Sequence, residues 1–374
     1  MQIAFTGDIM LGRLVNSVLC KNKFTYVWGD TLDIIRSADL SLINLECVIS
    51  SLGKKWNKTF KIFHFRAHLE AIDVLKVASI DYVSLANNHV LDYDVEAMVD
   101  MLDLLDKNGI KHSGAGRNLK EAMEPAILKI KKESKNTNSD RVITIGIISL
   151  TDNKQEWEAT DNYPGVNYIP TITLSKEKNN ENKKDKKELN NDNKKYYYDY
   201  DRLEYYITKA KQISDLVIVS SHVGSHFRES PSSDYVNFAH MIIDMGADIY
   251  WGHSNHMPQG IEIYKENRII MYDCGDFIDD YGVDLIHRND LSFIFLLNFE
   301  DSNNNDDSNR LIMKDIELIP IKISDFRANS VLTKDEVDVV IGRMIKRCNY
   351  LGTDNCLVIN KETNGKRIIK VMLT

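Results

Sequence analysis

The chain has few cysteines, no long hydrophobic run and no excess of positive charge. Its 374 residues include five cysteines, an odd number without a C-x-x-C pair, which argues against a disulfide scaffold or a zinc knuckle and favours a reducing compartment. The longest apolar run, around Leu291–Phe299, is about half of the roughly 18–20 residues that span a bilayer. The first residues lack a basic flank and a long apolar stretch, so we expect no cleavable signal peptide, no transmembrane segment and a cytoplasmic protein.

The charge balance excludes another class of protein. There are 47 basic and 55 acidic residues, a formal net charge of −8, and this mild acidity argues against a nucleic-acid partner. Apolar residues make up 43% and charged residues 27% of the chain, which is typical of a globular protein. The sequence contains no indication of oligomeric state.

Three segments are polar and low in complexity: 131–140, 175–195 and 300–309. The longest, 175–195, has eight lysines, five acidic residues and six asparagines. Such segments bury too little apolar surface to offset the entropy lost on ordering, so we expect solvated loops or disorder. The interleaved acids make the longest segment a neutral insertion rather than a site for an anionic partner.

Short β-rich runs alternate with longer amphipathic stretches, which favours an α/β layered fold. We expect strands at Gln2–Thr6, Leu40–Ile43, Tyr82–Ala86, Val142–Leu150, Leu216–Ser221 and Ile249–Trp251. We expect helices at His68–Ala78, Val95–Asn108, Arg202–Ser214, Tyr235–Met245 and Lys334–Ile345. After Trp251 the pattern becomes strand-rich and antiparallel in character, at Gln259–Tyr264, Arg268–Tyr272, Leu291–Asn298 and Leu311–Ile321. Two packed sheets flanked by helices accommodate both patterns in one domain over 1–330, with 331–374 as a C-terminal extension packed on it.

Side chains of types that commonly bind metal ions follow five of the expected strands. These are Asp8, Glu46, Asn88 with His89, His222, and His253 with His256. In an open α/β sheet, ligands bind beyond the carboxyl ends of the strands, so these side chains are expected to converge on one crevice. Carboxylates, an amide oxygen and imidazoles suit two divalent ions such as Mn, Fe or Zn, which could activate one water molecule.

Each of these residues also has a purely structural explanation. Asp8 could cap a helix, Asn87-Asn88 could form a turn, and Asp92 could cap the helix after it. Likewise, Glu46 could pair with a basic neighbour, and His222 could be a core histidine. Gly252-His253-Ser254-Asn255-His256 is the more specific signal, because two histidines three residues apart after a glycine turn form a local chelate. The five strand ends together favour a site.

Six motifs, in this order, resemble the CapA family of poly-gamma-glutamate capsule synthesis proteins, within the calcineurin-like metallophosphoesterase superfamily. They are Gly7-Asp8-Ile9-Met10-Leu11-Gly12-Arg13, Asn44-Leu45-Glu46, Phe65-Arg66-Ala67, Ser84-Leu85-Ala86-Asn87-Asn88-His89, Gly114-Ala115-Gly116-Arg117 and Gly252-His253-x-x-His256. The similarity runs from Gln2 to about Asn298 and implies a metallophosphatase-like sandwich of two mixed β-sheets flanked by helices.

The resemblance also implies roles for individual residues. Asp8 and His256 would bind one metal ion, Asn88, His222 and His253 would bind the other, and Glu46 would bridge them. His89 would protonate the leaving group, held by Asp92 three residues later. Arg13 and Arg66 would hold an anionic substrate group, with surface salt bridges as the alternative for both.

The chain departs from the family pattern in three places. Metallophosphoesterases commonly begin with Asp-x-His, whereas Asp8 is followed by Ile9-Met10, so the first metal ion has one ligand fewer. The family's Gly-His-His-Pro-His is Gly252-His253-Ser254-Asn255-His256 here. Its Gly-Asn-Phe is Gly275-Asp276-Phe277, which brings Asp276 near the site without an assigned ion.

Two functions follow from these patterns. The first is a metal-dependent hydrolase that cleaves phosphoesters with a dimetal-activated water molecule. The alternative is the binding, processing or synthesis of poly-gamma-glutamate or a related γ-glutamyl polymer. The substrate would accordingly be a small anionic or γ-glutamyl compound. A non-catalytic binding module is a third possibility.

Overall fold

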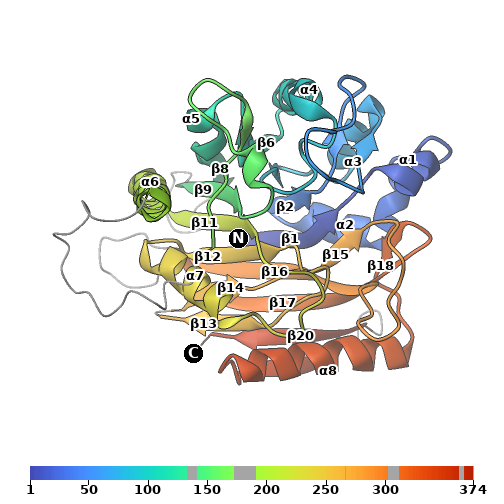
Figure 1. The fold of residues 1–374 in the computed structure, drawn as a ribbon. Coiled ribbons are helices and arrows are strands. Elements are labelled where there is room, and N and C mark those ends of the chain that lie inside the picture. The colour runs from blue at the N-terminus through green and yellow to red at the C-terminus, as the bar shows by residue number, and fades with distance from the viewer. Residues whose placement is uncertain (133–140, 172–190, 266, 302–310, 362–365, 374) are drawn as a thin grey trace.

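The computed structural model describes residues 1–132, 141–171, 191–265, 267–301, 311–361 and 366–373. Two β-sheets stack face to face, with helices on their outer surfaces (Figure 1). This arrangement confirms the predicted α/β sandwich of two mixed sheets. None of the helices in the described part of the chain has the length and apolar character needed to span a bilayer.

The first sheet has the strand order β19-β20-β17-β16-β1-β2-β5-β6. Its parallel part consists of β1 (Gln2–Ile9), β2 (Leu40–Leu45), β5 (Tyr82–Ser84) and β6 (Lys111–Ser113). Its antiparallel part consists of β16 (Leu291–Asp301), β17 (Leu311–Ser324), β20 (Lys366–Met372) and β19 (Cys356–Lys361). Two short strands lie off this path: β15 (Asp276–Ile278) pairs with β1, and β18 (Arg327–Asn329) pairs with β17.

The second sheet has the order β13-β14-β12-β11-β9-β8. Its strands are β13 (Ile261–Tyr264), β14 (Arg268–Met271), β12 (Ile249–His253), β11 (Leu216–His222), β9 (Arg141–Thr151) and β8 (Ala126–Lys132). The four central strands are parallel, and β13 and β8 are antiparallel edges. Two short pairs complete the strands: β3 (Val48–Ile49) with β4 (Arg66–Ala67), and β7 (Ala115–Gly116) with β10 (Gly165–Val166).

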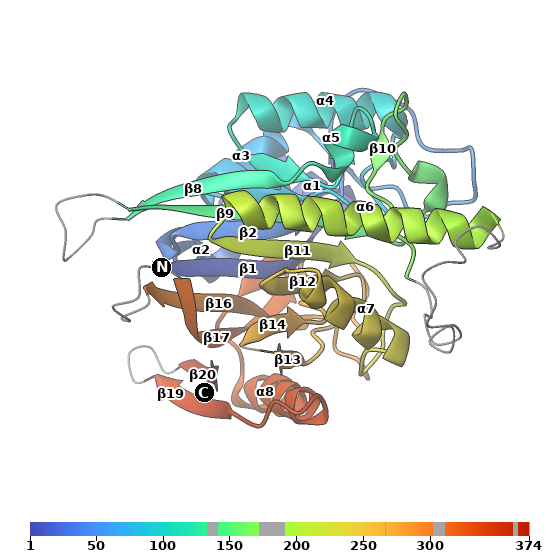
Figure 2. The same ribbon diagram turned by 90° about the vertical axis from the view of Figure 1, so that its left-hand side faces the viewer.

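The helices cover the two outer faces (Figure 2). The first sheet is covered by α1 (Arg13–Leu19), α2 (Leu32–Ser37), α3 (Ile72–Val77) and α4 (Asp94–Lys107), while α6 (Asn191–Ile213) and α7 (Ser233–Asp244) cover the second. Helices α5 (Leu119–Met123) and α8 (Lys334–Tyr350) and the 3₁₀ turns Tyr26–Thr31, Leu69–Ala71 and Gln155–Trp157 complete the described elements.

The apolar core follows from the alternation of side chains along each strand. In β1, Ile3 and Phe5 face the second sheet, whereas Ala4 faces the helical layer. Phe5 meets Trp251 of β12 edge to face, with ring centroids 5.2 Å apart. The two sheets therefore share one interior, which positions the ends of β1 and β12 side by side.

Every helix and strand expected from the sequence is present, but several boundaries differ. Helix α6 starts at Asn191 rather than Arg202, so the segment predicted to be a loop to Lys195 is helical at its end. Likewise Lys131–Lys132 belong to β8 and Glu300–Asp301 to β16, because each insert joins strands that pair beyond the apolar pattern. The remaining parts of the three predicted loops, 133–140, 175–190 and 302–309, lie outside the described residues.

The C-terminal segment joins the first sheet. Strand β20 pairs with β17, for example Ile316 with Val371. Helix α8 buries Val340, Ile341 and Met344 in the cluster between the sheets. The hairpin β19–β20 and the strand β8 were not predicted, although Leu128-Lys129-Ile130-Lys131 in β8 alternates apolar and polar residues.

Candidate metal centre

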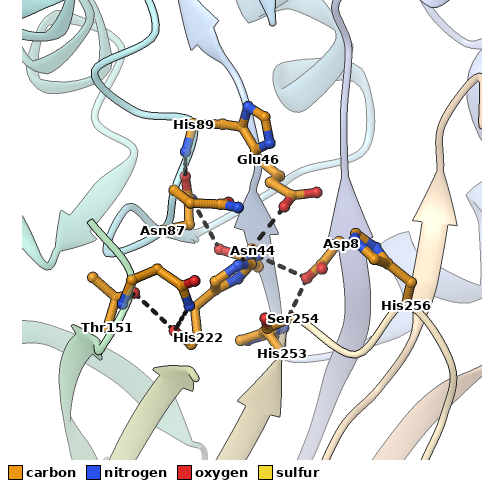
Figure 3. A network of polar contacts seen from close by, with 12 residues as sticks. Asp8, Asn44, Glu46, Asn87, His89, Thr151, His222, His253, Ser254 and His256 are labelled. Atoms are coloured by element: carbon orange, nitrogen blue, oxygen red, sulfur yellow. Dashed lines mark hydrogen bonds and ion pairs between the residues drawn. The ribbon is translucent and has the colours of Figure 1, made fainter. Parts of the chain in front are cut away.

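The predicted site residues gather at the carboxyl ends of the parallel strands (Figure 3). Asp8 lies near the end of β1, His222 at the end of β11 and His253 at the end of β12. Glu46 follows β2 directly. Parallel strands bring their carboxyl ends to one edge, which explains why Asp8 and His256 meet here although they are 248 positions apart in the chain.

Asp8 is at the centre of this group. Its side chain is 1% exposed, and its Oδ1 accepts a hydrogen bond from the Asn44 side-chain amide at 2.7 Å. The same oxygen lies 3.1 Å from Nδ1 of His253. Burial alone raises the pKa of Asp8, but the His253 hydrogen bond and the neighbouring histidines outweigh it and hold the pKa below its usual value. Asp8 is therefore a buried carboxylate that carries its charge.

Glu46 and His222 form the side of the site next to Asp8. Oε1 of Glu46 lies 3.7 Å from Nε2 of His222, and Oε2 accepts a hydrogen bond from the Tyr281 hydroxyl at 3.1 Å. The His222 main-chain oxygen accepts the Thr151 hydroxyl at 2.7 Å, which fixes the end of β11. Burial and the charge of Asp8 raise the pKa of Glu46 well above its usual value.

His256 and Asp276 form the opposite side. Nδ1 of His256 lies 2.8 Å from Oδ1 of Asp276, which is 0% exposed. His256 has a positive φ of 61°, a conformation that costs energy for a residue with a side chain and recurs at functional sites. Asn255 holds this turn, because its amide donates to the Met257 and Arg228 main-chain oxygens.

Several buried ligand atoms of this cluster have no hydrogen-bond partner among the described residues. They are Oδ2 of Asp8, Oε1 of Glu46, Oδ1 of Asn88, Nε2 of His222, Nε2 of His253 and Oδ2 of Asp276. Buried polar atoms are normally paired, because an unpaired one costs about 1–3 kcal/mol. All of these atoms except that of Asn88 belong to residues gathered around Asp8, and this set fits metal ions, whose ligands are these same atom types.

The ligand atoms form two overlapping groups. Asp8, His256 and Asp276 offer ligand atoms that all lie within 4.8 Å of one another, and so do Asp8, Glu46 and His222. Asp8 is common to both groups. The residues of the cluster therefore fit two neighbouring cations that share one carboxylate.

Next to the cluster, His89 and Asp92 form the pair that the sequence predicts. Nδ1 of His89 lies 2.6 Å from Oδ2 of Asp92, and the His89 ring stacks on Phe65 with centroids 3.9 Å apart. Nζ of Lys61 lies 3.0 Å from Oδ1 of Asp92 and donates to the Asn88 main-chain oxygen at 2.7 Å. The ring is thus held at Nδ1 and on one face, and Nε2 is the ring nitrogen that is not engaged with Asp92.

The two predicted substrate-binding arginines already have partners. Nε of Arg13 lies 3.2 Å from Asp280, and its guanidinium lies 5.5 Å from the centroid of Phe65, the ring that supports His89. Arg66 stacks on Tyr93 at 3.9 Å from the ring centroid and donates to the Leu52 main-chain oxygen. Arg13 thus forms a salt bridge and Arg66 stacks on an aromatic ring, and their role in substrate binding stays a prediction.

Sequence reasoning gave no role to two residues that organise the site. Asn44 is fully buried, donates to Asp8 and accepts a 3.2 Å hydrogen bond from the Asn87 amide. Lys61 is a nearly buried cation, with 5% of its side chain exposed. Asn44 stands in the recognised Asn-Leu-Glu motif, so a signal was present, whereas Lys61 lies in a loop without any pattern.

The fold and the site define an α/β sandwich of two sheets that collects buried carboxylate and histidine ligand atoms at the ends of its parallel strands. The chain belongs to the family described as bacterial capsule synthesis protein PGA_cap, whose profile matches residues 2–281. The resemblance of the six motifs to the CapA family is thereby confirmed.

Curated relatives support the same assignment. A probable polyglutamine synthesis accessory protein of Mycobacterium tuberculosis is 27% identical over 330 residues, covering 86% of this chain and 77% of the relative. The PGA biosynthesis protein CapA of Bacillus subtilis is 28% identical over 279 residues, covering 75% of this chain and 63% of that protein. The capsule biosynthesis protein CapA of Bacillus anthracis is 28% identical over 287 residues, covering 75% and 60%.

Proposed function

We propose that this chain acts in the synthesis or processing of a γ-linked glutamate polymer, through a divalent-metal centre built around Asp8. Family membership and the names of the relatives support the polymer. The observation that carries the metal centre is the set of buried, unpartnered ligand atoms of Asp8, Glu46, His222 and His253. The polymer's repeated carboxylates are the kind of anionic group that a dication binds.

The ligand assignment refines the one that the family resemblance implies. The resemblance makes Glu46 the bridge, with Asp8 and His256 on one ion and Asn88, His222 and His253 on the other. Since Asp8 contributes to both groups of ligand atoms, we assign the bridge to Asp8, with Glu46 on the side of His222. Asn88 and His253 would complete that second ion, since each has a buried, unpartnered ligand atom.

When bound, two ions of the Mn, Fe or Zn type would neutralise substrate charge and acidify a water molecule. His89 is placed to move a proton at Nε2, because Nδ1 is engaged with Asp92. Phe65 keeps the imidazole plane fixed, and Lys61 orients the Asp92 carboxylate. Asn44 holds Asp8 in place through a side chain that carries no charge.

Incubation of the purified chain with poly-γ-glutamate and Mn²⁺ tests this proposal. We expect saturable, metal-dependent binding or shortening of the polymer, measured by size-exclusion chromatography with light scattering. Asp8→Asn and His222→Ala should abolish the effect, whereas Asp73→Asn, an exposed change on α3, should not. Equal effects in wild type, Asp8→Asn and His222→Ala would exclude this site, and well under about one metal ion per chain would exclude the metal centre.

Phosphoester hydrolysis is the second candidate function. It is favoured by the hydrogen-bonded pair of His89 and Asp92, which could protonate a departing alkoxide oxygen. An aryl phosphate assayed with Mn²⁺ or Co²⁺ separates the two functions. Turnover that disappears in His89→Ala and leaves the polymer unchanged would favour the phosphoesterase.

A further inference from the structure

Asp276 stands beside Asp8 on an adjacent strand. Strand β15 runs parallel to β1, and the register pairs Asp8 with Asp276. The approach is unusually close, since a Cβ added to Gly7 would lie 1.9 Å from the Gly275 main-chain oxygen. The Asp8 main-chain N–H donates to that same oxygen at 2.8 Å. The missing side chain of Gly7 thus lets the two strands bring their carboxylates together.

These carboxylates lie together in the interior, where charge repulsion is costly. Both side chains are at most 1% exposed, and the Glu46 carboxyl lies in the same cluster. Asp8 and Glu46 each have one oxygen without a hydrogen-bond partner among the described residues, and so does Asp276, which also faces a further buried carboxyl group, that of Asp279. Buried like charges destabilise a fold unless a cation compensates them or a proton neutralises them. The free oxygens point to compensation by a cation.

The residues that follow Asp8 in the chain do not supply a second ligand for an ion bound at Asp8. Two positions after Asp8 stands Met10, which is fully buried in the apolar cluster on the helical side of the sheet. Its sulfur accepts a hydrogen bond from the Gly12 main-chain N–H at 3.0 Å. Met10 therefore provides no ligand next to Asp8, whereas Asp276 is the register partner of Asp8 on the neighbouring strand β15.

We propose that Asp276 is a direct metal ligand, which shares an ion with Asp8 and His256 through the carboxylate oxygen that is not paired with His256. This inference rests on the metal centre of the proposed function and adds a residue to it. Two carboxylates and one imidazole form an oxygen-rich set, which suits a hard cation such as Mn²⁺. Asp276 thereby supplies the ligand that Met10 does not.

The competing role for Asp276 is orientation of His256 without contact to the ion. A carboxylate that holds the second nitrogen of a metal-bound histidine is common, and its loss weakens metal binding about 10–100-fold. Asp276→Asn separates the two roles, since the amide oxygen can still accept from Nδ1 of His256 but the charge is gone. Asp280→Asn is the matched control. It removes the charge of a carboxylate that lies four residues after Asp276 and pairs with Arg13.

The test combines Mn²⁺ titration calorimetry with a crystal structure of the Mn²⁺-loaded chain at the manganese absorption edge. We expect two ions per wild-type chain, one of them within about 2.0–2.4 Å of an Asp276 oxygen. The Asp276→Asn variant should bind one ion with unchanged affinity and the other with an affinity lowered by more than about 100-fold. The Asp280→Asn variant should bind both ions with unchanged affinity.

Three results would overturn the inference: no bond between Asp276 and an ion in the wild-type crystal, no ion bound at all, or an Asp276→Asn titration that matches the wild type. The crystal measurement requires no variant, so it decides the question even if Asp276→Asn fails to fold. If the ions bind as expected but poly-γ-glutamate is neither bound nor shortened, the proposed function fails and the assignment of Asp276 stands.

Discussion

At the scale of single residues, Asn44 connects side chains from three strands or their loops. Its amide nitrogen donates to Asp8, and also lies 3.3 Å from Nδ1 of His222. Its oxygen accepts from Asn87, whose own oxygen accepts from the His89 main-chain N–H. A neutral amide is suited to this position, because it satisfies a carboxylate and a second amide without adding charge to the cluster.

Asn44→Ala should weaken Mn²⁺ binding by about 10–100-fold, since Asp8 loses the contact that orients it. The free energy of unfolding should fall by about 1–3 kcal/mol, because buried polar partners lose their hydrogen bonds. Titration calorimetry and chemical denaturation measure the two effects. Ser84→Ala, on the strand next to Asn44, is the control: its buried hydroxyl bonds to Ser149 and Ser220 and to none of the candidate ligands, so stability should fall and Mn²⁺ affinity should not. Equal Mn²⁺ affinities of wild type and Asn44→Ala would refute this role.

At the scale of elements, the contact between β1 and β15 requires glycine at position 7. Any side chain there would collide with the Gly275 carbonyl, and this contact holds Asp8 beside Asp276. Gly7→Ala should therefore lower the free energy of unfolding by at least about 1–3 kcal/mol and weaken metal binding at the same time. In contrast, a Cβ added to Gly342 in α8 would meet no atom within 4 Å. Gly342→Ala should therefore raise the free energy of unfolding by about 0.5–1 kcal/mol. Denaturant midpoints of the two variants show whether stability falls for Gly7→Ala and rises for Gly342→Ala. A Gly7→Ala protein as stable as the wild type would contradict the close contact between Gly7 and the Gly275 carbonyl.

Helix α8 begins with a capping box in which Thr333 and Glu336 bond to each other's main-chain N–H groups. The hydrogen bond from Lys322 and the one from the Thr333 N–H lower the pKa of Glu336 to about 2, from 4.5. Because the folded pKa lies below the unfolded one, the Glu336 charge stabilises the fold above about pH 4.5, and this contribution disappears as the pH falls towards 2.

Glu336→Gln should therefore lower the free energy of unfolding by about 1 kcal/mol at pH 7 and by less at pH 3, since glutamine keeps its part in the capping box. Urea denaturation at the two pH values measures the difference. Lys334→Gln, at an exposed position on the same turn, should show no such pH dependence. A Glu336→Gln effect that is constant or grows towards pH 3 would contradict the depressed pKa.

At the scale of the whole molecule, the two sheets and α8 share one apolar interior. Met344 of α8 is 1% exposed and belongs to the same cluster as Phe5 of β1 and Trp251 of β12. Loss of packing at one end of the chain is therefore felt by strands at the other end. The site depends on this interior, because the Trp251 ring also packs against His253 with centroids 4.5 Å apart.

Met344→Ala should lower the free energy of unfolding by about 2–5 kcal/mol, from lost burial and the cavity left behind. We expect one calorimetric transition, shifted to lower temperature, rather than a separate early transition of the C-terminal segment. Val339→Ala, a half-exposed change on the same helix, should alter stability by no more than about 0.5 kcal/mol. An early separate transition would show that α8 and its hairpin unfold independently.

The sequence by itself determined the class of fold, the family and most of the polar cluster. Alternating strands and helices predict layers, and polar residues at strand ends predict an edge site, because both signals are local in the chain. His253 and His256 could be found for the same reason, since one turn holds both. The boundary of α6 and the hairpin β19–β20 could not, because pairing with distant strands and helices outweighs weak local patterns.

Only the tertiary structure decided how the candidate ligands are grouped. The neighbours Asp8 and Asp276 are 268 positions apart, and the close pairing of their strands depends on Gly7, whose main chain touches the Gly275 carbonyl. The roles of Asn44 and Lys61 likewise depend on contacts with side chains from other strands and loops. Distances between residues far apart in the chain are set by the packing of the two sheets, which no local pattern encodes.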